Sequence, residues 1–135
     1  MKSYLSFSVN DSEHDIVTYL SQMLNEKKFS VTTNHSLLFL KNINQSHIFI
    51  GLITATNKKN NEVVLDDWQS ARSQNIPSLL LVDKKTLKML PERFLKEDGL
   101  PIKNIIAFNK AKPMEELGLV KEKINQASYQ LEHVW

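Results

Sequence analysis

The chain has 135 residues, of which 41% are hydrophobic and 24% charged, and its formal net charge is +2. These values are typical of an ordinary globular domain, and the charge is too small to indicate a nucleic-acid-binding protein. The absence of cysteine excludes disulfides, thiolate metal sites and cysteine nucleophiles. The sequence shows no apolar run long enough to cross a bilayer and no leader, so we expect one cytoplasmic domain over residues 1–135.

The first predicted elements are a strand and a helix. The run Tyr4–Val9 is rich in aromatic and β-branched residues with partial alternation, which predicts a strand. Asn10 and Asp11 indicate a turn. Ser12 followed by Asp15 resembles a capping box and predicts a helix that continues to about residue 26.

The next segments predict two strands with a polar region between them. Phe29–Thr33 is the second expected strand, and Ser36–Asn42 is long enough for a short helix. The strongly apolar run His47–Ile53 predicts a third strand that is buried on both faces. A polar loop, Thr54–Asn61, is expected to follow it.

The central helix is predicted over Glu62–Ser73. Val64, Trp68 and Ala71 follow one another at helical spacing and form its expected inner stripe. The apolar run Ser78–Val82 then predicts a fourth buried strand.

The last third begins with an irregular stretch, Lys84–Pro101, whose apolar residues are expected to cover an edge of the sheet. Asn104–Phe108 predicts a fifth strand. Pro113 suits the first position of a final helix, because its missing N–H is not needed there.

Strands and helices therefore alternate along the chain, and the central strands are nearly continuous apolar runs. That pattern is typical of parallel sheets covered by helices on both faces. We predict a three-layer, doubly wound α/β fold of the flavodoxin-like type, with five parallel strands in the order 2-1-3-4-5.

Ligands of such folds bind beyond the carboxyl ends of the strands. Phe7, Ser8 and Asn10 fall at that end of the first strand and are candidate substrate contacts. Asp67 and Trp68 fall near the start of the central helix and are further candidates. By position alone, acidic residues in a first turn need no function, because they face the positive end of the helix dipole.

Other kinds of site are not indicated. The three glycines lie far apart, which excludes a P-loop or a GxGxxG phosphate cradle. The four histidines show no metal-ligand spacing, so no metal site is predicted.

Several segments together resemble the Toll/interleukin-1 receptor (TIR) domain family, and in particular its bacterial members. The resemblance covers nearly the whole chain. The matching segments are LSFS at residues 5–8 with Asp11, IFIGLIT at 48–54, the spacing of Val63, Val64, Asp67 and Ala71, and IIAFNK at 105–110 with Pro113.

The resemblance implies a function. Many TIR domains cleave the N-glycosidic bond of NAD with a Glu on the third helix, and the matching residue here is Asp67. It implies NAD as a substrate rather than a bound cofactor, no metal, and hydrolysis or cyclisation of NAD in bacterial immunity or signalling. It also implies oligomers formed by self-association or with another TIR or effector protein, without nucleic acid or membrane.

This sequence departs from the family pattern in two places. Asp67 is one methylene shorter than Glu, and the segment Thr33–Ser46 is shorter than usual. A non-catalytic interaction module of the same family is the main alternative, and a nucleoside-processing enzyme of similar fold is another. A phosphorylation-receiver domain shares the strand order, but the third strand ends in Ile53 and Thr54 rather than in a phosphoacceptor Asp.

Overall fold

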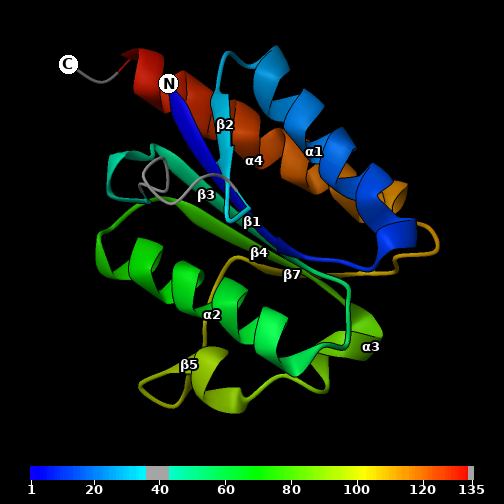
Figure 1. The fold of residues 1–135 in the computed structure, drawn as a ribbon. Coiled ribbons are helices and arrows are strands. Elements are labelled where there is room, and N and C mark those ends of the chain that lie inside the picture. Colours follow the sequence, from blue (N-terminus) through cyan, green and yellow to red (C-terminus); the bar gives the residue numbers. More distant parts are fainter. Residues whose placement is uncertain (36–42, 134–135) are drawn as a thin grey trace.

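A five-stranded parallel sheet lies at the centre of the computed structural model, which describes residues 1–35 and 43–133 (Figure 1). Its strand order, β2-β1-β3-β4-β7, confirms the predicted doubly wound α/β fold and its 2-1-3-4-5 order. The strands are β1 (Lys2–Ser8), β2 (Ser30–Thr33), β3 (Ile48–Ile53), β4 (Ser78–Asp83) and β7 (Ile105–Phe108).

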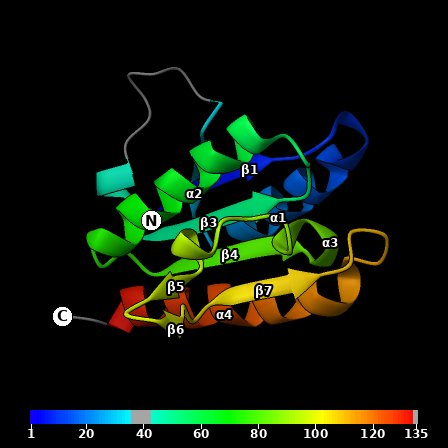
Figure 2. The same ribbon diagram turned by 90° about the horizontal axis from the view of Figure 1, so that it is seen from below.

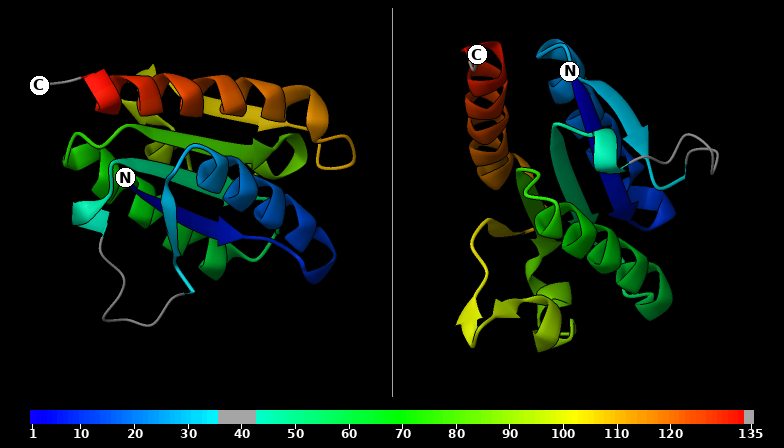
Figure 3. Two further views of the ribbon diagram at one scale, coloured as in Figure 1. Left: turned by 90° about the horizontal axis from the view of Figure 1, so that it is seen from above. Right: turned by 90° about the vertical axis from the view of Figure 1, so that its left-hand side faces the viewer.

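Helices cover both faces of this sheet. The helices α1 (His14–Glu26) and α4 (Met114–His133) lie on one face, and α2 (Lys58–Ser73) lies on the other, as Figures 1 and 3 show. The short helix α3 (Lys84–Leu87) follows β4 directly. Within the described ranges, no helix has the length and apolar character needed to cross a bilayer.

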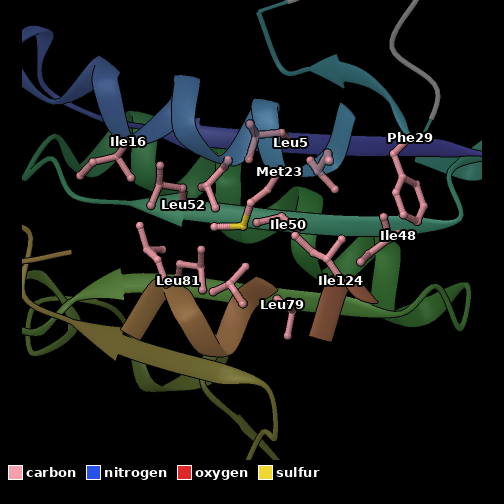
Figure 4. Packing of buried hydrophobic residues seen from close by; sticks show 14 of the residues in the cluster. Leu5, Ile16, Met23, Phe29, Ile48, Ile50, Leu52, Leu79, Leu81 and Ile124 are labelled. Carbon is pink, nitrogen blue, oxygen red and sulfur yellow. The ribbon is translucent and has the colours of Figure 1, made fainter. Parts of the chain in front are cut away.

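The larger core fills the space between the sheet and the pair α1 and α4 (Figure 4). Alternate residues of each strand point to this side, because successive side chains of a strand face opposite ways. The buried members include Leu5, Ile50, Leu52, Leu79 and Leu81 from the strands, Ile16, Leu20, Met23 and Leu24 from α1, and Leu117, Val120 and Ile124 from α4.

The second core lies under α2 and is built around Trp68, which is fully buried. Gly51 of β3 allows the helix to pack closely on the sheet. A Cβ at this position would lie 2.8 Å from Leu80 Cδ1 and 3.3 Å from Val64 Cγ1. The residue paired with Gly51 on β1 is Ser6, which is also small. Short side chains at these two positions let α2 approach the sheet closely.

The predicted start of the central helix was wrong by four residues. The helix α2 begins at Lys58, and the Asn57 side chain caps it by accepting a hydrogen bond of 3.0 Å from the Asn60 backbone N–H. Asn is a strong N-cap because its oxygen satisfies one of the unpaired first-turn donors. Asp66 and Asp67 therefore lie in the third turn, away from the helix terminus.

The predicted capping box of Ser12 and Asp15 is also absent. A 3₁₀ turn, Asp11–Glu13, precedes α1, and the helix has no side-chain cap at its start. Ser12 instead lies inside this turn, which is closed by a hydrogen bond of 2.9 Å from the Glu13 backbone N–H to the Asn10 carbonyl.

The segment after α3 contains more structure than expected. A two-stranded antiparallel hairpin forms from β5 (Lys96–Glu97) and β6 (Leu100–Pro101), visible beside β7 in Figure 2. Leu90 and Phe94 are buried in the core between α2 and the sheet, so apolar residues of this segment do cover part of the sheet as predicted. Met89 is exposed. The short helix predicted over Ser36–Asn42 falls outside the described residues.

We expect Gly51→Ala to destabilise the protein by roughly 1–3 kcal/mol, because the added methyl group overpacks a filled core. Gly118→Ala is the matched control. Gly118 lies in α4, and apart from the adjacent residues and the backbone of its own helix no atom lies within 4 Å of the place that an alanine methyl group would take, so alanine there should stabilise by about 0.5–1 kcal/mol. Urea unfolding of both variants measures the difference. Equal effects of the two substitutions would contradict this account of Gly51.

Candidate functional site

A cleft of about 320 Å³ opens at the carboxyl end of β1. Parallel strands bring the loops that follow β1 and β2 to this edge, and α1 and α2 both start there. The described lining residues are Phe7, Ser8, Val9, Asp11, His14, Asn34, His35, Asn60 and Val63. Of the predicted substrate contacts, the structure thus brings Phe7 and Ser8 to the cleft.

Asn34 holds one wall of the cleft in place. Its Nδ2 donates to the Phe7 carbonyl and its Oδ1 accepts from the Phe7 backbone N–H, each at 3.0 Å. This pair of bonds continues the β1–β2 pairing beyond Leu5 and Thr33, where the strand ladder ends. The turn at residues 34–35 is thereby fixed against the end of β1.

Three aromatic rings gather at the cleft. The His35 ring lies 4.6 Å from the Phe7 ring, measured between centroids, and is tilted by 37°. The His14 ring meets the Phe7 ring edge-on at 5.9 Å. Aromatic pairs at these separations attract one another beyond simple burial.

Buried oxygens without partners lie at the same edge of the sheet. Among the described residues, Ser8 Oγ, Thr54 Oγ1 and Asn61 Oδ1 have no hydrogen-bond partner, although each side chain is at least nine-tenths buried. The backbone around them is well paired, since the Thr54 and Ala55 N–H groups both donate to the Ser8 carbonyl. Unpaired buried polar atoms are rare and often mark functional positions.

Asp67 lies beneath the cleft rather than in its wall. Its Oδ2 accepts a hydrogen bond of 2.8 Å from the Ser6 hydroxyl, and its side chain is half-buried. On α2 it shares a face with Asn60 and Val63, which line the cleft, at spacings of seven and four residues. The carboxylate is thus about one helical turn, or roughly 6 Å, deeper than Val63.

The surroundings of Asp67 also affect Tyr4. Burial, together with the negative charge of Asp67, raises the pKa of the Tyr4 phenol well above its ordinary value of 10.0. Tyr4 points to the same face of the sheet as Ser6, one strand repeat further from the cleft. The negative carboxylate of Asp67 therefore lies close to the buried, poorly hydrated side chain of Tyr4.

Two predicted contacts do not reach the cleft. Trp68 is fully buried in the core, where Arg72 lies over its ring at 5.3 Å. Asn10 is exposed, and its Nδ2 donates to Glu13 Oε1 at 2.6 Å. Glu13 in turn pairs with Lys110, whose backbone N–H donates to Asp83, so this group ties together the loops after β1, β4 and β7.

Sequence reasoning did not assign the other seven described lining residues to a site, namely Val9, Asp11, His14, Asn34, His35, Asn60 and Val63. Only Asn34 carried a usable signal, because an Asn directly after a strand often closes a turn. The histidines were judged by metal-ligand spacing alone. No group of three or more potential metal ligands is found among the described residues.

Comparisons with known proteins support the fold assignment but give no function. No family model and no curated protein matches the sequence. Among solved structures, a flavodoxin from the domain Archaea matches with a TM-score of 0.58 at 9% sequence identity, covering 98% of this chain and 100% of that chain. Identity this low shows a shared fold alone.

We expect Tyr4 to stay protonated in the folded protein at pH 11, because its folded pKa is raised. The stability that this neutral phenol contributes is present below pH 10 and is lost as the pH rises towards the folded pKa. Absorbance at 295 nm measures tyrosinate. Up to pH 11 the wild type and Tyr4→Phe should therefore gain equal absorbance. An extra tyrosine titrating in the wild type would contradict the raised pKa.

Proposed function

We propose that this protein is a bacterial TIR-like domain that acts on NAD in the cytoplasm, cleaving its N-glycosidic bond by hydrolysis or cyclisation, in defence or signalling. The observation that carries the proposal is the half-buried carboxylate of Asp67, fixed by Ser6 below the cleft at the carboxyl end of β1. This is the edge of the sheet where ligands of doubly wound folds bind.

One carboxylate is chemically sufficient for this reaction. The bond between ribose C1′ and the pyridinium nitrogen breaks, and its electron pair neutralises the departing nicotinamide. The ring leaves without being protonated, so no general acid is required. The ribose left behind resembles an oxocarbenium ion, which a nearby negative charge stabilises. Water or a nucleophile within the substrate then attacks C1′.

The geometry of Asp67 supports this role in two ways. The Ser6 hydroxyl orients the carboxylate, and a fixed negative group stabilises developing positive charge without reorganising during the reaction. Incomplete exposure to water strengthens that interaction further. A ligand seated in the cleft must extend along α2 past Val63 by roughly 6 Å to bring its ribose to the carboxylate.

A flavin cofactor is not part of the proposal. Flavin mononucleotide binds doubly wound folds at the switch point beside β1. Its phosphate would meet the turn after β1, which places the Asp11 carboxylate at the cleft and contains no glycine. A carboxylate at this point repels a phosphate dianion, so the residues present do not suit this cofactor.

The alternative is a non-catalytic TIR-like module that binds partner proteins or a second copy of itself. The Ser6 hydrogen bond is the observation that favours it, because a carboxylate that only ties α2 to β1 needs no substrate. The two functions differ in whether NAD is consumed.

We expect concentrated protein to convert NAD to free nicotinamide, and Asp67→Asn to reduce this turnover at least a hundredfold. The amide keeps an acceptor for Ser6 but removes the charge, so we expect a stability loss of only about 1 kcal/mol. Chromatography of the products measures turnover, and thermal unfolding measures stability.

Two further variants sharpen this test. Asp66→Asn is the matched control, because Asp66 is the exposed neighbour on the same helix and should retain full activity. Asp67→Glu restores the family's side-chain length and should keep or raise activity. Unchanged turnover in Asp67→Asn would rule out Asp67 as the catalytic group, and no turnover by the wild type at any concentration would favour the interaction module.

A further inference from the structure

The loops that follow β3, β4 and β7 carry only positive charge. Residues 54–61, 84–91 and 109–113 contain no aspartate, glutamate or arginine, and no aromatic residue. Because the whole chain has a net charge of only +2, the rest of it is net negative. The positive charge is therefore concentrated at one place. The lysines of these three loops, which form what we call the basic edge, are Lys58, Lys59, Lys84, Lys85, Lys88, Lys110 and Lys112.

Two hydrogen bonds hold the three loops together. The strands β3, β4 and β7 are parallel neighbours, so their carboxyl ends meet at one edge of the sheet, with α3 beyond them (Figure 2). The Lys110 backbone N–H donates to Asp83 Oδ1 at 3.1 Å, which joins the loop after β7 to the start of α3. The Thr86 hydroxyl donates to the Thr54 carbonyl at 3.4 Å, which joins α3 to the end of β3. Asp83 and Thr86 are buried, so the three loops form one continuous surface.

The lysines of the basic edge lie mostly in water. All of them except Lys110 are exposed. Lys110 is partly buried and pairs with Glu13 at 3.4 Å. Exposed charges of one sign repel one another and raise the local concentration of ions of the opposite sign. The basic edge therefore favours a ligand whose negative charges are spread over the same width.

An exposed apolar side chain accompanies these lysines. Met89 follows Lys88 at the end of α3 and is 63% exposed. The next residue, Leu90, is buried in the core under α2, so the chain turns inward and leaves the Met89 side chain outside. Membrane-surface segments combine lysines, which attract anionic headgroups, with apolar side chains that enter the acyl boundary.

We propose that the basic edge docks on an anionic lipid surface, with its lysines against the headgroups and Met89 inserted between them. Its chemistry favours lipid over nucleic acid. Aromatic stacking holds single strands and arginine forks hold phosphates, and the three loops contain neither kind of residue. An acidic protein would need no inserted apolar side chain. The proposal does not rest on the proposed reaction, and the family resemblance, which implies no membrane, does not suggest it.

The charge distribution also sets the orientation of the docked protein. The loop after β1 lies at the same edge of the sheet, but β1 is separated from β7 by β3 and β4. This loop carries Asp11, which is exposed and lines the cleft. An anionic lipid surface repels its carboxylate while attracting the basic edge. The protein therefore tilts onto its β4 and β7 side, and the cleft stays open to water.

The test compares vesicles of phosphatidylglycerol and phosphatidylcholine in equal amounts with vesicles of phosphatidylcholine alone, by cosedimentation. At about 0.15 M salt we expect binding to the anionic vesicles only, and it should weaken steeply as added salt screens the charges. A triple variant, Lys59→Gln with Lys85→Gln and Lys112→Gln, removes one charge from each loop. It should bind about a hundredfold more weakly, because each lysine close to an anionic membrane contributes about fivefold.

The matched control is the triple variant Lys28→Gln with Lys103→Gln and Lys121→Gln. It has the same net charge, and it changes exposed lysines outside the basic edge. It should lose less than about tenfold, because charges more than a Debye length from the lipid are screened. Met89→Ser should weaken binding by roughly tenfold through lost apolar burial. Leu100→Ser, at an exposed position on the hairpin, should leave binding unchanged.

All these substitutions are at exposed positions, so thermal unfolding should match that of the wild type. Equal losses in the two triple variants, equal binding to both kinds of vesicle, or no binding to the anionic vesicles would each overturn the proposal. Binding to polyglutamate or to duplex DNA without binding to vesicles would overturn it in favour of an acidic protein or a nucleic acid.

Discussion

The close packing of α2 on the sheet at Gly51 is the constraint on which the site depends. Because Gly51 has no side chain, Val64 of the helix and Leu80 of the neighbouring strand both occupy the space above it. Ser6, paired with Gly51 across the sheet, is small as well. These two short side chains let α2 pack close enough for Asp67 to accept a hydrogen bond from the Ser6 hydroxyl.

The same docking sets the relation between the carboxylate and the cleft. The helix runs back from the carboxyl edge of the sheet, so its first turns reach the cleft and its third turn contacts β1 at Ser6. Asn60 and Val63 therefore line the opening while Asp67 lies below it. A carboxylate at this depth contacts a substrate only if the substrate extends inward along the helix, which is the geometric demand of the proposed reaction.

The chemistry of the cleft comes from loops rather than from the sheet. Asn34 turns the chain back onto the end of β1, and this turn brings His35 to Phe7. The group formed by Glu13, Lys110 and Asp83 ties down the loops on the other side of the same edge. Rigid anchoring of loops by a stable scaffold is the usual basis of binding sites in this class of fold.

The sequence by itself determined the fold class and the strand order. The apolar runs at residues 48–53 and 78–82 and the helical stripe of Val64, Trp68 and Ala71 are local patterns, and the structure confirms the strands and the buried stripe that they predicted. Phe7 and Ser8 could also be placed at the carboxyl edge in advance, because the end of a strand is recognisable along the chain. The start of α2 is also set locally, because the Asn57 cap bonds to Asn60 only three residues along the chain. Only the tertiary structure decided the depth of Asp67 and the position of His35 beside Phe7. Both depend on contacts between residues far apart in the chain, such as Ser6 with Asp67 and Phe7 with Asn34, and no local periodicity encodes such contacts.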